Sequence, residues 1–199
     1  MKPFAVTWDY RCPFARNAHE HLVAALADGA DWDVTFLPFS LSQVHVPEGG
    51  TPVWDDPDKF KDLLALATGV VVRDQYPEQF GAAHVALFSA RHDRSLDLRD
   101  DAVVAGVLDA AGVPGDKVLA EVAAGGPIEE IKRSHLLAVN ERSVFGVPTF
   151  VVDGRAEFVR LMSRPQGDAA LARRTIEGIV RLMDEQPDLN EFKYTTLER

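Results

Sequence analysis

Residues 8–16 read Trp8-Asp9-Tyr10-Arg11-Cys12-Pro13-Phe14-Ala15-Arg16, and this stretch decides the fold. An alternating apolar pattern typical of a strand ends at Trp8, and apolar residues at helical spacing begin at Phe14. Between them lies Cys12, the only cysteine in the chain, followed directly by proline. Proline is favoured in the first turn of a helix, because the N–H that it lacks would have no partner there. We therefore expect Cys12 at the N-terminus of a helix, where the helix dipole favours a thiolate.

The neighbours of Cys12 bear on what its sulfur can do. Arg11 and Arg16 are expected to add positive charge that favours a thiolate. A dithiol redox centre would hold a second cysteine at position 15, which is Ala15, so no disulfide can form within the chain. The alternative interpretation is that Cys12 is a small buried core residue. Its place at a strand-to-helix junction, directly before proline, favours the reactive interpretation.

Length and composition exclude several classes of protein. A chain of 199 residues with 46% hydrophobic residues suits one globular domain, or one domain with a large insertion. The formal net charge of −10 argues against nucleic acid or an anionic membrane as the main partner, since both require basic surfaces. No segment resembles a membrane span or a signal peptide. The sequence therefore predicts a cytoplasmic protein, although a mature exported protein would look the same.

The first part of the chain predicts a βαβ unit. The patterns indicate a strand over 3–8, a helix over 13–27 and a second strand over 32–39. A helix between two strands implies a parallel pair with a right-handed crossover. Residues 40–56, which hold His45 and Trp54, are predicted to be a loop, either an ordinary connection or a flap over the site that starts at Cys12.

The middle of the chain predicts a helical block of about 85 residues, because prolines at helix starts and glycines after helix ends recur along it. The expected helices lie over 56–69, from 76 onward, over 98–111, over 114–124 and over 127–142. They are not sequence repeats of one another. We expect them to pack as a small bundle over one end of the sheet.

The last part of the chain predicts a hairpin and a helix. Strands over 149–152 and 156–161 are separated by Asp153-Gly154, a strong two-residue turn signal. Pro148 must open the first of these strands or lie in a special turn, because proline cannot donate to a sheet ladder, and a cis Val147–Pro148 bond would suit such a turn. Asp168 is expected to cap a final helix.

A short tail completes the chain. Pro187 is predicted to end the final helix, and residues 188–199 follow it. Phe192 and Tyr194 suggest that part of this tail packs back on the protein.

This order of elements resembles the thioredoxin fold of the DsbA family. The resemblance extends over nearly the whole chain and is closest to the branch of FrnE-like oxidoreductases, 2-hydroxychromene-2-carboxylate isomerase and kappa-class glutathione transferase. Its most specific motifs are Asp9-x-x-Cys12-Pro13-Phe14 and Val144-Phe145-Gly146-Val147-Pro148-Thr149-Phe150. It implies an α/β thioredoxin-like domain formed by residues 1–45 and 143–199, with a loop and helical bundle inserted over 46–142.

The resemblance also implies a site. In this family the proline of the Gly-Val-Pro-Thr motif is cis and faces the active cysteine, so Cys12 and Pro148 are expected to be neighbours. The backbone of Val147 would then bind an extended substrate or a thiol cofactor in the manner of an added strand.

Three features depart from the family pattern. Ala15 replaces the second redox cysteine, which argues against a dithiol cycle. The transferase and isomerase branch usually has serine at the position of Cys12. The segment 158–165 lacks the Gly-x-Asp-Arg-Leu-like sequence of the isomerase branch, which disfavours isomerase activity.

A single activated cysteine allows three kinds of chemistry. It can form a mixed disulfide that a second thiol must release, it can be oxidised to a sulfenic acid, or it can hold a cofactor thiolate as serine does in the transferase branch. We predict a monothiol oxidoreductase of the DsbA/FrnE type. The alternatives are a kappa-type thiol transferase or isomerase, and a non-catalytic family member that binds peptides or thiols.

The expected partners follow from this chemistry. No cofactor is expected to be tightly bound, and glutathione or another low-molecular-weight thiol is the candidate cosubstrate. The partner is a small thiol or disulfide, or a protein disulfide, and a homodimer is an open alternative. No metal site is predicted, because none of the six histidines has metal-ligand spacing with a cysteine or carboxylate partner.

The candidate site combines the two motifs, with Cys12 as the catalytic residue. The predicted substrate- or thiol-binding residues are Asp9, Tyr10, Pro13, Phe14, Arg16, Trp54, Val147, Pro148 and Thr149. Asp9 either hydrogen-bonds the loop or tunes proton transfer at the sulfur. Tyr10 and Trp54 line a pocket or belong to the aromatic core, and Arg16 is either a solvated charge or a stabiliser of the thiolate.

Overall fold

The computed structural model describes residues 1–191 and contains one four-stranded sheet within them. The strand order is β2-β1-β3-β4, with β1 over Phe4–Trp8, β2 over Val34–Pro38, β3 over Thr149–Val152 and β4 over Arg155–Phe158. The expected α/β fold is therefore confirmed. The predicted packing of Phe192 and Tyr194 lies outside the described residues.

The βαβ unit forms as the sequence predicts. Helix α1 spans Pro13–Ala27 and connects β1 to β2, which pair in parallel from Phe4 opposite Val34 to Trp8 opposite Pro38. Strand β2 is shorter than the expected 32–39. Trp32 precedes it and packs edge-on against Phe4 instead, with ring centroids 6.1 Å apart.

The predicted hairpin is also confirmed. β3 pairs antiparallel with both β1 and β4, and the turn between β3 and β4 consists of Asp153 and Gly154. Both turn residues have positive φ, +48° and +79°, as a tight two-residue hairpin turn requires. Strand β4 ends at Phe158 rather than at 161, and the N–H of Val159 instead donates to the carbonyl of Pro148 (3.1 Å).

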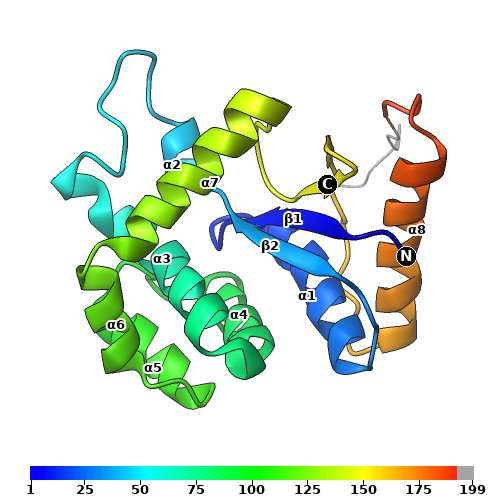
Figure 1. The fold of residues 1–199 in the computed structure, drawn as a ribbon. Helices are drawn as coiled ribbons and strands as arrows, with labels where there is room; N and C mark the ends of the chain where they lie inside the picture. The colour runs from blue at the N-terminus through cyan, green and yellow to red at the C-terminus, as the bar shows by residue number, and fades with distance from the viewer. Residues whose placement is uncertain (192–199) are drawn as a thin grey trace.

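In the view of Figure 1 the inserted helices lie to the left of the sheet and α8 lies to the right, and both α4 and α8 pack against α1. The short helix α2 and the 3₁₀ helix η1 precede the larger ones. Their bounds are α2 Leu41–Val44, η1 Pro57–Lys59, α3 Phe60–Gln75, α4 Pro77–His92, α5 Asp101–Ala110, α6 Gly115–Ala123 and α7 Gly126–Arg142.

Two sequence predictions for this region are wrong. The helix expected to end at Gly69 continues to Gln75, because residues 70–72 are buried valines that belong to the core. Residues 40–56 are not all loop, since they include α2. Trp54, near their end, packs with Val53 and Leu63 in a small hydrophobic cluster, which ties this end of the segment to α3.

Helix α8 spans Ala169–Glu185 and covers α1. It begins where Asp168 accepts a hydrogen bond from the N–H of Leu171 (2.8 Å), as the capping prediction required. Four residues at helical spacing are buried: Ala172, Ile176, Val180 and Met183. This stripe buries the apolar face of α8 and leaves the polar face to solvent.

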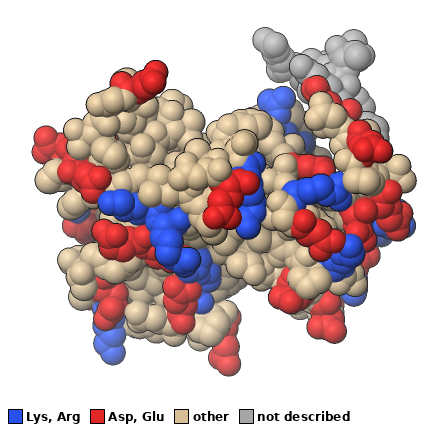
Figure 2. Space-filling model, turned by 45° about the horizontal axis from the view of Figure 1, so that its top comes forward, with Lys and Arg blue, Asp and Glu red and all other residues tan. Residues whose placement is uncertain are grey.

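The surface carries charges of both signs. On the face shown in Figure 2, lysine and arginine side chains are interspersed with aspartate and glutamate. Among residues 1–191, no helix has the length and apolar character that crossing a bilayer requires.

Candidate functional site

Cys12 lies where the two predicted motifs meet. β1 and β3 are antiparallel, so the end of β1 and the start of β3 lie at the same edge of the sheet. Cys12 is the N-cap of α1, and its Sγ accepts a hydrogen bond from the N–H of Ala15 (3.4 Å). The thiol donates to the carbonyl oxygen of Val147 (3.2 Å), and the Val147–Pro148 peptide bond is cis. The structure thus brings Cys12, Val147 and Pro148 together.

The loop that contains Pro148 is held by buried hydrogen bonds. The N–H of Thr149 donates to Oγ1 of Thr7 (2.8 Å), and Oγ1 of Thr149 donates to the carbonyl of Gly146 (2.8 Å). Both threonines are buried. Thr149 therefore fixes the position of the Val147 carbonyl from within the protein, and its own side chain has no open face for a ligand.

The prediction that Cys12 is held as a thiolate is wrong for the protein without a ligand, because the pKa of the thiol is raised. Cys12 is 9% exposed, and burial raises the pKa of its thiol. Hydrogen bonds from the N–H groups of Ala15 and Phe14 oppose this shift in pKa, and the nearby charge of Asp9 adds to it. The helix N-terminus does favour the anion, but the loss of water around the sulfur has the larger effect.

Asp9 holds the loop that precedes Cys12. Its carboxylate accepts hydrogen bonds from the N–H of Arg11 (2.9 Å) and from the N–H of Leu41 at the start of α2 (2.8 Å). Burial raises the pKa of Asp9, and these two hydrogen bonds oppose that effect. The sequence allowed two roles for Asp9, hydrogen bonding within the loop or tuning proton transfer at the sulfur. These contacts fit the first role.

Tyr10, in the loop of residues 9–12 between β1 and α1, is fully buried against the helical insertion. Its hydroxyl is 2.8 Å from Nδ1 of His84, and its carbonyl accepts a hydrogen bond from Nε2 of His92 (2.9 Å). Burial raises the pKa of Tyr10 far above its usual range. The phenol is therefore neutral and structural.

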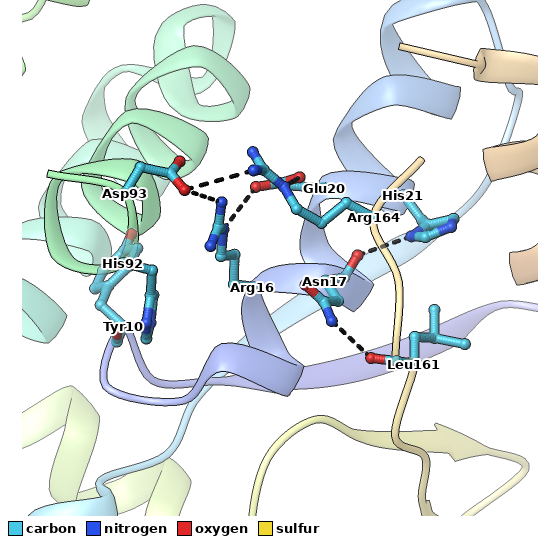
Figure 3. Close-up of polar contacts among 9 residues, drawn as sticks. All are labelled: Tyr10, Arg16, Asn17, Glu20, His21, His92, Asp93, Leu161 and Arg164. Atoms are coloured by element: carbon cyan, nitrogen blue, oxygen red, sulfur yellow. Dashed lines mark hydrogen bonds and ion pairs between the residues drawn. The ribbon is translucent and has the colours of Figure 1, made fainter. Parts of the chain in front are cut away.

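Arg16 does not stabilise the sulfur as expected. Its guanidinium pairs with Glu20 on the next turn of α1 (Nε–Oε1, 3.0 Å) and with Asp93 at the end of α4. Arg164 contacts the same two carboxylates, so the four side chains form one cluster (Figure 3). Arg16 is 9% exposed, and its charge is neutralised within this cluster. It joins α1 to the helical insertion.

The remaining predicted residues fall into two groups. Pro13 is exposed at the first position of α1, and Phe14 is half-buried beside it with the guanidinium of Arg160 over its ring (5.3 Å). Trp54 is buried and packs edge-on against His135 (5.4 Å). Phe14 is therefore available at the site, whereas Trp54 belongs to the core.

A pocket of about 330 Å³ lies beside the loop of residues 9–12. Its lining residues come from the loop, from α3 and from the segment that joins α4 to α5: Asp9, Tyr10, Arg11, Lys61, Asp62, Ala65, Leu66, Arg91, Ser95, Asp97, Leu98 and Arg99. Sequence reasoning missed Lys61, Arg91 and Arg99. No motif marks them, because only the packing of the insertion brings them to the loop. A second hollow, of about 440 Å³, lies at the β3–β4 turn and contains none of the predicted site residues.

The fold and the paired Cys12 and Pro148 loops define a thioredoxin-like thiol site. The family model of the DSBA-like thioredoxin domain matches residues 6–166, and the chain belongs to this family. A search of curated proteins finds no match.

Solved structures share the fold at low sequence identity. Cytosolic disulfide reductase DsbM from Pseudomonas aeruginosa, solved with GSH, is 16% identical with a TM-score of 0.61, covering 90% of this chain and 100% of its own. A 2-hydroxychromene-2-carboxylate isomerase is 15% identical with a TM-score of 0.59, covering 94% and 99%. Pseudomonas aeruginosa DsbA is 21% identical with a TM-score of 0.56, covering 92% and 86%.

Proposed function

We propose that this protein is a thiol-dependent oxidoreductase in which Cys12 is the single nucleophile. The observation that carries the proposal is the contact between Sγ of Cys12 and the carbonyl of Val147, at the N-cap of α1. This contact puts the sulfur beside a backbone segment that can align an extended or thiol-bearing substrate. Cys12 is the only cysteine, so the cycle requires a second thiol molecule.

The proposed cycle has two exchange steps. The thiolate of Cys12 attacks the small-thiol sulfur of a mixed disulfide, the old S–S bond breaks, and the leaving substrate thiolate takes up the proton that Cys12 released. A low-molecular-weight thiolate then attacks the sulfur bound to Cys12. This step releases a small disulfide and restores the Cys12 thiolate. Over the full cycle, one mixed disulfide and one small thiol become one released thiol and one small disulfide, so one free thiol is consumed for each substrate disulfide that is reduced.

The pocket beside the loop supports a small acidic thiol as the second substrate. Its volume of about 330 Å³ lies within the range of small-molecule sites. Arg11 and Arg91 line it, and neither forms an ion pair with any residue of the described range 1–191. The carboxylates of a thiol such as glutathione could pair with either of these cations. The relative DsbM was solved with GSH.

Intact mass spectrometry tests the proposal. The protein is incubated with the oxidised forms of several small thiols, with Cys12→Ser as the control. We expect one added thiol on the wild type, removal of that adduct by the reduced thiol, and catalysed deglutathionylation of a model substrate. Absence of any adduct at pH 8–9, where a raised thiol pKa still leaves some thiolate, would refute it.

The contacts of Cys12 favour one alternative function. A neutral thiol that donates a hydrogen bond could instead donate to the thiolate of a bound cofactor, as in a thiol transferase or isomerase of the kappa type. Cys12→Ser preserves such a donor. Activity of this variant toward an electrophile in the presence of a small thiol would select the alternative. Binding of the thiol with no turnover in either assay would select the non-catalytic family member.

We also propose that the protein acts in the cytoplasm. A single unpaired cysteine suits a reducing compartment, and the relative DsbM is described as cytosolic. Fractionation of cells that express the full-length protein tests this, and recovery outside the cytoplasmic fraction would contradict it.

A further inference from the structure

One face of α4 contacts Tyr10 at its hydroxyl, its ring and its backbone carbonyl. His84, Phe88 and His92 follow one another at intervals of four residues and therefore share this face. Nδ1 of His84 meets the tyrosine hydroxyl (2.8 Å), the ring of Phe88 packs edge-on against the phenol (4.8 Å), and Nε2 of His92 donates to the tyrosine carbonyl (2.9 Å; Figure 3 shows the last pair). We call these three residues and Tyr10 the α4 clasp.

Hydrogen bonds behind the clasp run in one direction. Nε2 of His19 is 3.1 Å from the carbonyl of Thr7, which can only accept, so this nitrogen carries the hydrogen. Nδ1 of His19 then accepts from Nε2 of His84 (2.9 Å). It follows that Nδ1 of His84 accepts and that the hydroxyl of Tyr10 donates. Both histidines are neutral, each with one tautomer that the Thr7 carbonyl determines.

Helix α3 closes the other side of the tyrosine. A methyl group at Gly69 would lie 2.5 Å from the hydroxyl oxygen of Tyr10, which is closer than real side chains approach. Tyr10 itself is 1% exposed. The ring therefore cannot slide along α4 or turn toward α3, and both ends of the residue are anchored to the insertion.

The clasp leads directly to the reactive sulfur. Tyr10 lies two residues before Cys12, inside a turn in which the N–H of Cys12 donates to the carbonyl of Asp9 (3.2 Å). The hydrogen-bond chain behind it ends at Thr7, whose side chain also accepts from Thr149 beside Pro148. The two loops that form the Cys12–Val147 contact are therefore both held by the same buried series of hydrogen bonds.

We propose that the α4 clasp positions Cys12, so that Tyr10 and His92 are positioning residues through which the helical insertion sets the burial of the sulfur. This deepens the proposed function, because it concerns the atom that the function assigns as nucleophile. Release of the clasp lets the Asp9–Cys12 turn move outward. The sulfur then gains water and loses its contact with the Val147 carbonyl.

The test measures alkylation of Cys12 by iodoacetamide from pH 6 to pH 10, followed by intact mass. The variants are Tyr10→Phe and His92→Leu, with His92→Gln as a conservative rescue because its side-chain N–H can still donate to the Tyr10 carbonyl. Val180→Ala in α8 is the control for a general loss of core packing. Circular dichroism confirms that each variant is folded.

We expect Tyr10→Phe and His92→Leu to lower the alkylation midpoint and to raise the rate at pH 7 about threefold, which corresponds to about half a pKa unit. His92→Gln and Val180→Ala should follow the wild-type profile. Profiles of folded Tyr10→Phe and His92→Leu that superpose on the wild type would overturn the proposal, as would a shift of equal size in Val180→Ala. Alkylation requires no turnover, so a failed exchange assay and a failed clasp are separate results.

Discussion

Acidification should destabilise this protein through its buried histidines. His19, His84 and His135 are neutral in the folded state, because burial lowers the pKa of each below the ordinary value of 6.5. The unfolded chain binds protons at these sites near pH 6.5, whereas the folded chain does so only near pH 4 for His19 and His135. Their contribution to stability is therefore complete above pH 6.5 and is lost as the pH falls toward 4.

The size of the effect follows from the two pKa values. For a histidine with a pKa of 6.5 unfolded and about 4 folded, acidification from pH 7 to pH 5 lowers the free energy of unfolding by about 2 kcal/mol. His19 and His135 each contribute this amount. Asp9 changes the stability in the opposite direction on acidification, since burial raises its pKa. The effect of one histidine is therefore measured by comparing the wild type with a variant that lacks only that histidine.

His135→Phe is the most informative variant. The imidazole stacks on Phe39 with ring centroids 4.3 Å apart, and its buried Nδ1 has no hydrogen-bond partner within residues 1–191. A phenyl ring keeps the stacking and removes the titration. Urea unfolding at pH 7 and pH 5, followed by circular dichroism, should show a loss on acidification that is about 2 kcal/mol smaller in the variant than in the wild type.

The result that refutes this reasoning is an equal loss of stability in the two proteins. It would mean that the imidazole of His135 binds a proton as readily in the folded state as in the unfolded state, and that its burial carries no electrostatic cost.

Two further predictions concern packing and charge. Gly69→Ala should cost about 1–3 kcal/mol of unfolding free energy, because the new methyl group would overlap the hydroxyl of Tyr10, whereas Gly106→Ala in α5 has open space and should cost nothing. Urea midpoints compare the two, and equal midpoints would contradict the close approach. Glu20→Gln should cost about 3 kcal/mol, because it leaves buried Arg16 with one carboxylate fewer. A stability unchanged at low salt would show that this cluster is not coupled to folding.

Local patterns predicted most of the fold. Prolines and aspartates at helix starts identified α1, α4 and α8, and Asp153-Gly154 identified the hairpin, because each signal acts on its own few residues. The end of α3 was missed for the opposite reason. Gly69 looks like a stop signal in isolation, but the burial of the valines that follow it favours continuing the helix.

The site was predicted in outline only. The resemblance to the DsbA family, which rests on the two motifs, correctly implied that Cys12 and Pro148 are neighbours. The ionisation of the sulfur was predicted wrongly. A helix N-terminus is visible in the sequence, but the extent to which other segments remove water from it is not.

The amino-acid sequence by itself determined the order of the elements, the place of the single sulfur at a helix start and the absence of a second thiol. Only the tertiary structure decided that Arg16 forms an ion pair with Asp93 and that Trp54 is buried in the core. It also decided that the hydroxyl of Tyr10 hydrogen-bonds His84, which lies 74 positions away in the sequence. The physical reason is the distance along the sequence over which each effect acts. Capping and turn preferences act within a few residues, whereas desolvation and charge pairing depend on whichever side chains the packed fold brings together.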